Sequence, residues 1–296
     1  AWYEKLNISY TGNMKNDINT KERDFSVTPK SLANDWRNGV QHRIPVNLDL
    51  KMFRFFTLNP NLNYTERWYF KSIYKDWDEE QNRIVNTDTV TGFNRVYDYS
   101  FGVGTGTKVY SFYRPSRAIF GDKIDAVRHV MSPSVSFSYS PDFGAPKYGY
   151  YDWIEYYDPN RDEVVRHDYS PYERGIYGVP GRGESGSLGF GLGNTIEMKV
   201  RSDRDSTGFR KIAILEALNF SSSYNFLADS LKLSRINMSG RTKIFGTSIN
   251  FGAVFNPYAL DTLSNGRPFI VDRFEWKENR RLARMESANL SFGVNF

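Results

Sequence analysis

The sequence predicts an all-β protein, an antiparallel transmembrane β-barrel with about ten strands in this chain. Three observations lead to this prediction. Ten segments alternate residue by residue between apolar and polar side chains, as strands with a different environment on each face do. The polar face of these segments consists mostly of Ser, Asn, Gly and Thr. The connections between the segments alternate between long and short.

The composition favours strands and turns and argues against several other classes of protein. Of the 296 residues, 16% are aromatic and 23 are Gly, which are residue types typical of strands and turns. No stretch of 18 apolar residues occurs, which excludes a transmembrane helix. The net charge of +5 comes without a basic run that contains aromatic residues, so nucleic acid is not expected as a partner. Cysteine is absent, so neither disulfides nor thiol chemistry is expected.

Residues 129–142, "HVMSPSVSFSYSPD", show the alternation most clearly, with Val135 and Phe137 on one face and serines on the other. Four more segments of the N-terminal half alternate in the same way, near residues 2–16, 41–52, 56–74 and 92–112. The C-terminal half contributes segments near residues 186–201, 214–227, 231–244, 247–258 and 286–296. Within these, "KIAILEAL" (211–218) fits a short amphipathic helix as well as a strand. The chain ends on Phe296, which resembles a barrel-assembly signal.

The lengths of the connections predict which ends of the strands face the outside of the cell. Long polar loops are expected near residues 17–38, 75–90, 142–185 and 259–285, and tight turns near 53–55 and 245–246. Short turns at one end and long loops at the other are typical of outer-membrane barrels. We therefore predict one barrel domain over residues 1–296, in the bacterial outer membrane, with the long loops outside the cell.

The polar face separates a membrane barrel from a soluble sheet. A soluble sheet usually exposes many Lys and Glu to bulk water, whereas here small polar residues dominate and charges are scattered. The alternating segments, of about twelve residues, are also longer than the usual strand of a soluble protein, which has about five or six residues. They match the ~9–11 residues with which a tilted strand crosses a bilayer. A wet, packed interior therefore fits the polar face, and lipid fits the apolar face, including Val135, Phe137, Leu192 and Ile196.

Several stretches resemble the LptD family of lipopolysaccharide-assembly proteins, in the form found in Bacteroidetes. They are "NLNYTERWYF" (61–70), "AVRHVMSPSVSFSYSPDF" (126–143), "LGNTIEMKVR" (192–201), "LNFSSSYNFLADSLKLS" (218–234) and "NPYALDTLSNGRPF" (256–269). The resemblance implies an outer-membrane translocon that passes lipopolysaccharide to the outer leaflet through a lateral opening. It also implies an LptE-like plug lipoprotein, with lipopolysaccharide and membrane lipid as the other partners.

The chain departs from the family pattern, because no periplasmic jellyroll is visible and the strands are too few for the family's very large barrel. The chain also begins with "AWYEKLNISY", which lacks the basic start and apolar core of a signal peptide, so we expect either that a signal peptide was removed or that the chain is an internal piece of a longer protein. We therefore expect it to be the barrel portion of a longer protein. A self-contained small porin-like barrel and a soluble β-rich carbohydrate-binding module are the alternatives.

Seven cations on the polar face are candidates for contact with lipid head-group phosphates, which Arg and Lys recognise well. They are Arg67, Lys108, Lys199, Arg201, Arg235, Arg241 and Lys243. The simpler interpretation is that they hydrate the interior and pair with neighbouring acids. Pro60 and Pro133 lie inside strands, where proline removes a ladder hydrogen bond. Either they loosen strand pairing beside a lateral gate or, more simply, they mark a bulge or rim.

Neither catalysis nor a metal or cofactor site is expected. The chain has three His residues and lacks a Gly-x-Ser-x-Gly elbow, a His-Glu-x-x-His motif and a phosphate-binding glycine loop. The loop at 148–169 is rich in carboxylates, which are the ligands that Ca²⁺ prefers, but their spacing does not match an EF-hand. The sequence therefore predicts a protein that is not an enzyme.

Overall fold

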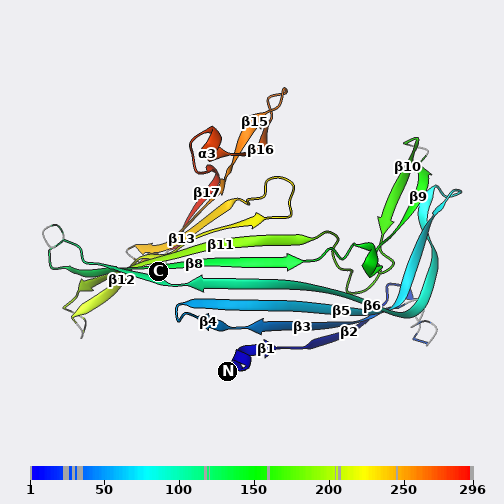
Figure 1. Cartoon of the computed structure of the whole chain (residues 1–296), viewed down its shortest axis with the longest axis horizontal. Coiled ribbons are helices and arrows are strands. Elements are labelled where there is room, and N and C mark those ends of the chain that lie inside the picture. The colour runs from blue at the N-terminus through cyan, green and yellow to red at the C-terminus, as the bar shows by residue number, and fades with distance from the viewer. Residues whose placement is uncertain are drawn as a thin grey trace. The chain divides into compact units, whose positions relative to one another are not determined.

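The computed structural model describes residues 2–22, 27–28, 31, 36–116, 119, 121–158, 161–203, 205, 208–244 and 246–293. Antiparallel strands dominate, as the sequence predicts (Figure 1). The main sheet has the order β1-β3-β5-β6-β8-β11-β12-β13-β14-β17, which is a path of ten strands, and β2, β4 and β7 pair with β3, β5 and β8 beside that path. Among the described residues, no helix combines the length and apolar character needed to span a membrane.

The strands of the first half begin after a short 3-10 helix, η1 (Trp2–Lys5), which replaces the start of the first predicted segment. They are β1 (Leu6–Ile8), β2 (Thr11–Asp17), β3 (Arg37–Leu48), β4 (Leu50–Met52), β5 (Phe56–Asp78), β6 (Arg83–Thr107), β7 (Val109–Tyr113) and β8 (Ile124–Ser140). Each of these strands overlaps one of the predicted alternating segments.

The strands of the second half are β11 (Ser185–Arg201), β12 (Phe209–Asn225), β13 (Ile236–Ile244), β14 (Thr247–Asn256) and β17 (Arg284–Gly293). The ambiguous residues 211–218 are strand, because they lie in β12 and pair with β11 through two register shifts. The terminal Phe296 lies outside the described residues. Among those residues, β1 pairs with β3 alone and β17 with β14 alone, so both are edge strands.

One predicted loop is wrong. Residues 75–78 and 83–90, which were expected to form a long loop, belong to β5 and β6. Only residues 79–82 form the turn, which Asp78 fixes by accepting a hydrogen bond from the backbone N–H of Gln81 at 2.9 Å. Asn82 completes the turn with a positive φ of 52°. The charged sequence suggested a loop, but ladder hydrogen bonds form between backbones whatever the side chains are.

Two other predicted loops contain structure of their own. Residues 142–185 include the 3-10 helix η3 (Pro146–Tyr148) and the hairpin of β9 (Asp152–Asp158) and β10 (Glu163–Tyr169). Residues 259–285 include the hairpin of β15 (Tyr258–Thr262) and β16 (Pro268–Phe274), followed by α3 (Glu275–Glu278) (Figure 1). Most of the loop predicted at 17–38 lies outside the described residues.

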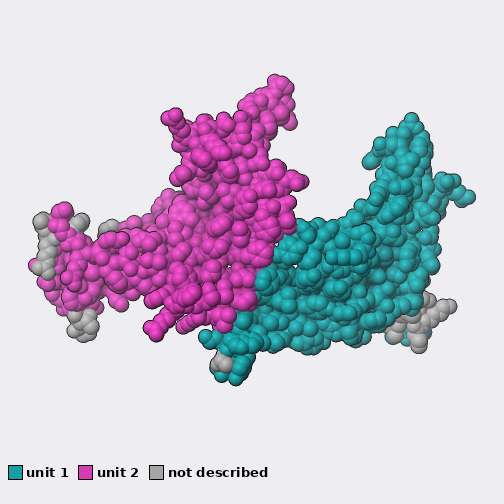
Figure 2. Space-filling model, in the orientation of Figure 1, with its two compact units in different colours: residues 1–48, 61–101, 139–185 teal, residues 49–60, 102–138, 186–296 magenta. Residues whose placement is uncertain are grey.

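The chain forms two compact units, coloured separately in Figure 2. Unit 1 comprises residues 1–48, 61–101 and 139–185, and unit 2 comprises residues 49–60, 102–138 and 186–296. The boundaries after residues 60, 101 and 138 fall inside β5, β6 and β8. The division therefore does not follow a linker.

Candidate functional site

The polar face of unit 2 is built from small side chains that fit together across strands. Ser134 and Ser136 of β8 lie against Gly191 and Gly189 of β11, so close that a Cβ built on either glycine would come within 2.5 Å of a serine Oγ. Small polar residues also occupy the paired positions on the next strands. They are Ser221 and Ser223 of β12, Asn237 and Ser239 of β13, Gly252 of β14 and Asn289 of β17. The predicted small polar face is thus a continuous surface.

The opposite face of unit 2 is apolar and open. Leu192 of β11 pairs with Phe220 of β12, and Phe251 of β14 pairs with Leu290 of β17. Leu290 is 60% exposed and Phe292 is 65% exposed. Soluble proteins rarely expose a large contiguous apolar surface unless another molecule binds to it. We therefore expect an apolar covering on this face.

Unit 1 has the same two faces, and there the chain covers the polar one. Gln41 and Tyr69, on the polar face of β3 and β5, are only 5% and 2% exposed. Phe93, on the apolar face of β6, is 62% exposed. A soluble protein buries its apolar face, so unit 1 has the opposite arrangement to that of a soluble sheet.

Residues 169–178, called the inner segment here, form this covering. The Tyr69 hydroxyl donates to the Gly178 carbonyl at 2.5 Å, and Ile73 N–H donates to the Pro171 carbonyl at 2.9 Å. Near its end, Tyr177 donates to the Asn13 carbonyl at 3.0 Å, and in its middle Glu173 forms an ion pair with Lys75 at 2.6 Å. The inner segment is therefore fixed to β2 and β5 by both backbone and side-chain bonds.

An aromatic cluster fixes the rest of the loop. Tyr69, Val96, Phe143 and Tyr150 form the buried core of unit 1, with Tyr172 packed against it. Tyr150 accepts a hydrogen bond from the backbone N–H of Tyr97 at 2.9 Å, and burial raises the pKa of Tyr150 to about 12. Burial also raises the pKa of Tyr172. Both phenols stay neutral at ordinary pH, as packing in an apolar cluster requires.

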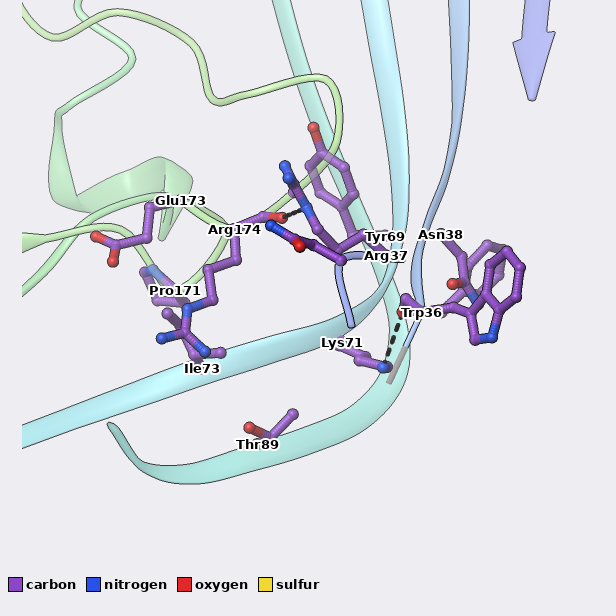
Figure 3. A pocket seen from close by; sticks show the side chains of 13 residues that line it. Trp36, Arg37, Asn38, Tyr69, Lys71, Ile73, Thr89, Pro171, Glu173 and Arg174 are labelled. Atoms are coloured by element: carbon purple, nitrogen blue, oxygen red, sulfur yellow. Dashed lines mark hydrogen bonds between the residues drawn. The ribbon is translucent and has the colours of Figure 1, made fainter. Parts of the chain in front are cut away.

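A pocket of 720 Å³ opens beside the inner segment, lined by Arg37, Lys71 and Arg174 among others (Figure 3). Its cations already have partners. Arg37 Nε donates to the Arg174 carbonyl at 2.9 Å, and Lys71 Nζ donates to the Trp36 carbonyl at 3.0 Å. The geometry is that of a junction between β3, β5 and the inner segment.

Of the seven candidate cations, Arg67 belongs to unit 1 and the other six belong to unit 2. Arg67 forms an ion pair with Asp98, and its Nε donates to the Tyr177 carbonyl at 3.2 Å. It therefore helps to hold the inner segment. Lys108 is the exposed residue that separates β6 from β7.

Three of the six candidate cations in unit 2 form ion pairs with acids. Lys199 bonds Asp125 at 2.8 Å and lies over the Phe209 ring at 3.8 Å. Arg241 bonds Glu216 at 2.8 Å, and Arg235 pairs with Glu286. Arg201 and Lys243 are exposed near the turns that follow β11 and β13. Four of the seven candidate cations are therefore paired with neighbouring acids.

Both predicted strand prolines lie level with a break in the adjacent strand. Pro60 of β5 falls between Leu58 and Asn61, whose partners Leu50 and Asn47 flank the gap between β4 and β3. Pro133 of β8 lies beside the break at Lys108, since Val109 pairs with Met131. In each case the residue that lacks an N–H lies level with an interruption of the adjacent strand.

Sequence reasoning missed one polar group, on the apolar face of unit 1. Tyr64 and Glu66 of β5 contact Arg95 of β6, with Arg95 Nε 2.9 Å from Glu66 and Arg95 Nη2 2.9 Å from the Tyr64 hydroxyl. The available signal was that Glu66 and Arg95 interrupt otherwise apolar positions of their strands. Within the described residues, no group of three or more acidic or His side chains is placed to hold a metal ion.

In a comparison with protein families, the family described as LptD protein matches residues 1–258. The chain belongs to the LptD family. LptD proteins handle lipopolysaccharide and are transport proteins, so the two-faced sheet is the surface on which to seek an LptD-like role. The LptD match ends at the first residue of β15, and the remaining strands β16 and β17 lie beyond it. Neither the curated proteins nor the solved structures contain a match to the chain.

Proposed function

We propose that this chain is the barrel portion of a Bacteroidetes-type LptD protein in the outer membrane, where it passes lipopolysaccharide to the outer leaflet. The observation that carries the proposal is the arrangement of the two faces. The apolar face is open in both units, whereas a loop of the chain itself covers the polar face in unit 1. Lipid fits the apolar face, and a wet interior fits the polar one.

The small residues of the polar face suit passage better than retention. Ser and Asn offer hydroxyls and amides for weak hydrogen bonds, and Gly leaves space for a bulky sugar. Cations such as Lys199 and Arg241 are already paired with acids, so they attract phosphate without trapping it. Acyl chains prefer an apolar route, which a lateral opening between edge strands provides. The proposal includes an LptE-like lipoprotein as a plug and further strands that complete the barrel.

The test is photo-crosslinking at two adjacent exposed positions of β13. Lys243 lies on the polar face, and Ile244 lies on the apolar face close to the β13–β14 turn, which the proposed topology places near the periplasm. A crosslinker at Lys243 of the full-length protein in living cells is expected to capture lipopolysaccharide. The same group at Ile244 is expected to capture phospholipid, because lipopolysaccharide resides in the outer leaflet.

Depletion of the full-length protein provides the second arm of the test. Newly made lipopolysaccharide is expected to stop reaching the cell surface while its synthesis continues. Normal surface lipopolysaccharide after depletion, with no capture at Lys243, would refute transport and favour a self-contained porin-like barrel. A chain that stays soluble without detergent would instead favour a carbohydrate-binding module.

A further inference from the structure

A polar cluster interrupts the apolar face of unit 1. Toward the turns, this face carries Ile44 and Val46 of β3, paired with Tyr64 and Leu62 of β5. Toward the loops it carries Trp68 and Phe93, whose rings lie 5.6 Å apart. The cluster of Tyr64, Glu66 and Arg95 lies between these apolar and aromatic zones. Charged residues on the lipid side of a barrel are unfavourable near the middle of the membrane and are tolerated at its interfaces.

Glu66 organises the cluster. Its carboxylate accepts hydrogen bonds from Trp68 Nε1 at 2.6 Å, from the Tyr64 hydroxyl, and from Arg95 Nε at 2.9 Å. The Glu66 side chain is only 14% exposed. With three donors already placed around it, this carboxylate acts as an anchor and presents little negative charge to the surroundings.

Arg95 is the outward member of the cluster. Its side chain is 55% exposed, although it contacts Glu66, the Tyr64 hydroxyl and the ring of Tyr97 at 5.2 Å. A guanidinium carries five N–H donors in a rigid fork, and the contacts to Glu66 and Tyr64 use one edge of it. These contacts hold the guanidinium in place and leave its other edge unused by Glu66 and Tyr64 in a half-exposed side chain.

We propose that Arg95, oriented by Glu66 and Tyr64, binds a phosphate of lipopolysaccharide in the outer leaflet, from outside the barrel wall. The inference rests on the proposed membrane placement. In that placement the tight turn at residues 53–55 lies on the periplasmic side, and Glu66 lies about ten residues farther along β5, about the length with which a tilted strand crosses a bilayer. The lipid beside this cluster therefore belongs to the outer leaflet. The phosphorylated sugar of lipopolysaccharide is the anion at that level, and a guanidinium binds phosphate with two parallel hydrogen bonds. Trp68 and Phe93 form an interfacial aromatic zone beside it.

The experiment measures the lipopolysaccharide retained by the full-length protein after purification from outer membranes in mild detergent, by native mass spectrometry. Arg95→Gln is expected to lower retention roughly tenfold, as loss of a charge-assisted contact would. Arg43→Gln is the matched control. Arg43 is an exposed arginine on the polar face of β3, level with Thr65 beside Glu66. It is expected to retain lipopolysaccharide as the wild type does.

A second probe identifies the chemistry. Added lipid A with both phosphates is expected to bind wild type more tightly than Arg95→Gln, and lipid A without phosphates is expected to bind both equally. Arg95→Lys keeps the charge but loses the fork, so an intermediate retention is expected, and this variant serves if Arg95→Gln does not fold. Equal retention by wild type, Arg95→Gln and Arg43→Gln would overturn the inference. Wild-type protein absent from the outer-membrane fraction would instead refute the proposed function on which it rests.

Discussion

Gly175 of the inner segment lies directly against the phenol ring of Tyr69. A Cβ built on Gly175 would come within 2.6 Å of the ring carbon Cζ and within 2.9 Å of the Tyr172 carbonyl oxygen. Neither neighbour is free to move, since Tyr69 belongs to the buried core and the carbonyl is backbone. The absence of a side chain at residue 175 therefore allows the inner segment to lie flat on the polar face of β5.

Gly175→Ala is expected to loosen the inner segment, at a cost of about 1–3 kcal/mol for overpacking. The measurement is the rate of proteolysis within residues 142–185 of the folded protein in detergent. Gly181→Ala is the control, because a Cβ there would meet no atom within 4 Å. Equal proteolysis of the two variants would show that the contact between Gly175 and Tyr69 does not hold the loop.

A chain of alternating charges fixes the base of the hairpin of β15 and β16. Arg235 pairs with Glu286, Glu286 bonds Arg284 at 3.2 Å, and Arg284 lies 3.7 Å from Glu275. Glu275 is 3% exposed and also accepts a hydrogen bond from Asn279 at 2.7 Å. Glu275 is thus the buried member of the charge chain; its removal leaves Arg284 paired with Glu286 but deprives Arg284 of its second acid and Asn279 of its acceptor.

Glu275→Ala is therefore expected to destabilise the hairpin by about 1–3 kcal/mol, as the loss of a buried hydrogen-bond partner does, and hydrogen exchange over residues 258–274 should rise. Glu278→Ala is the control, since Glu278 contacts Arg273 at 3.3 Å with both side chains largely exposed. An exchange rate that responds equally to both substitutions would mean that the charge chain does not anchor the hairpin.

The sequence predicted the strands well because two different environments impose a period of two along each of them. Residues 211–218 fitted a helix equally well, and pairing with β11 decided for strand. The predicted loop at 75–90 was wrong because charge is a weak guide to backbone pairing. The alternation also placed Lys199 and Arg241 on the polar face. Their acid partners Asp125 and Glu216 lie in other strands, so the sequence pattern did not predict these ion pairs.

The inner segment and the Arg95 cluster were beyond sequence reasoning for a different reason. The pattern within a loop does not say which surface the loop packs on, so the contact of Gly175 with Tyr69 had no local signal. Glu66 and Arg95 each interrupt an apolar pattern, but a single polar residue in a strand is common. Only the register that brings Arg95 to 2.9 Å from Glu66 makes them a pair.

The buried hydroxyl of Tyr150 predicts a dependence of stability on alkaline pH. Burial raises the pKa of Tyr150 to about 12 in the folded chain, against 10.0 for an ordinary tyrosine. The stabilisation that follows from this difference is fully present below pH 10 and is lost as the pH rises toward 12, because the unfolded chain releases its proton first.

The measurement is the free energy of unfolding in detergent between pH 9 and 12. In Tyr150→Phe this free energy is expected to fall less steeply with pH than in the wild type. Tyr3→Phe, which removes an exposed tyrosine, is expected to follow the wild type. Identical slopes for wild type and Tyr150→Phe would contradict the assignment of a raised pKa to this buried phenol.

The orientation of the loops is tested at the tip of the β15–β16 hairpin. Asn265 and Gly266 form a turn in which Gly266 has a φ of 80° and its N–H donates to the Leu263 carbonyl at 2.9 Å. A short epitope inserted after Asn265 should leave the strands intact, because the turn is exposed. We expect an antibody to reach it on intact cells, as the proposed topology requires. Labelling only after lysis would reverse the topology.

The assignment of the two faces is tested by placing the same charge on adjacent residues of β8. Phe137 lies on the apolar face, where its ring stacks on Phe226 with centroids 5.8 Å apart. Ser138 lies on the polar face, where its hydroxyl is 2.9 Å from the Ser187 hydroxyl.

An arginine facing lipid near the middle of a bilayer costs about 2–4 kcal/mol, whereas one facing a wet interior does not bear this cost. Phe137→Arg is therefore expected to reduce the amount of folded protein in the outer membrane much more than Ser138→Arg, as measured by heat-modifiable migration on gels. If both variants assemble equally, either the faces are reversed or lipid does not contact this strand.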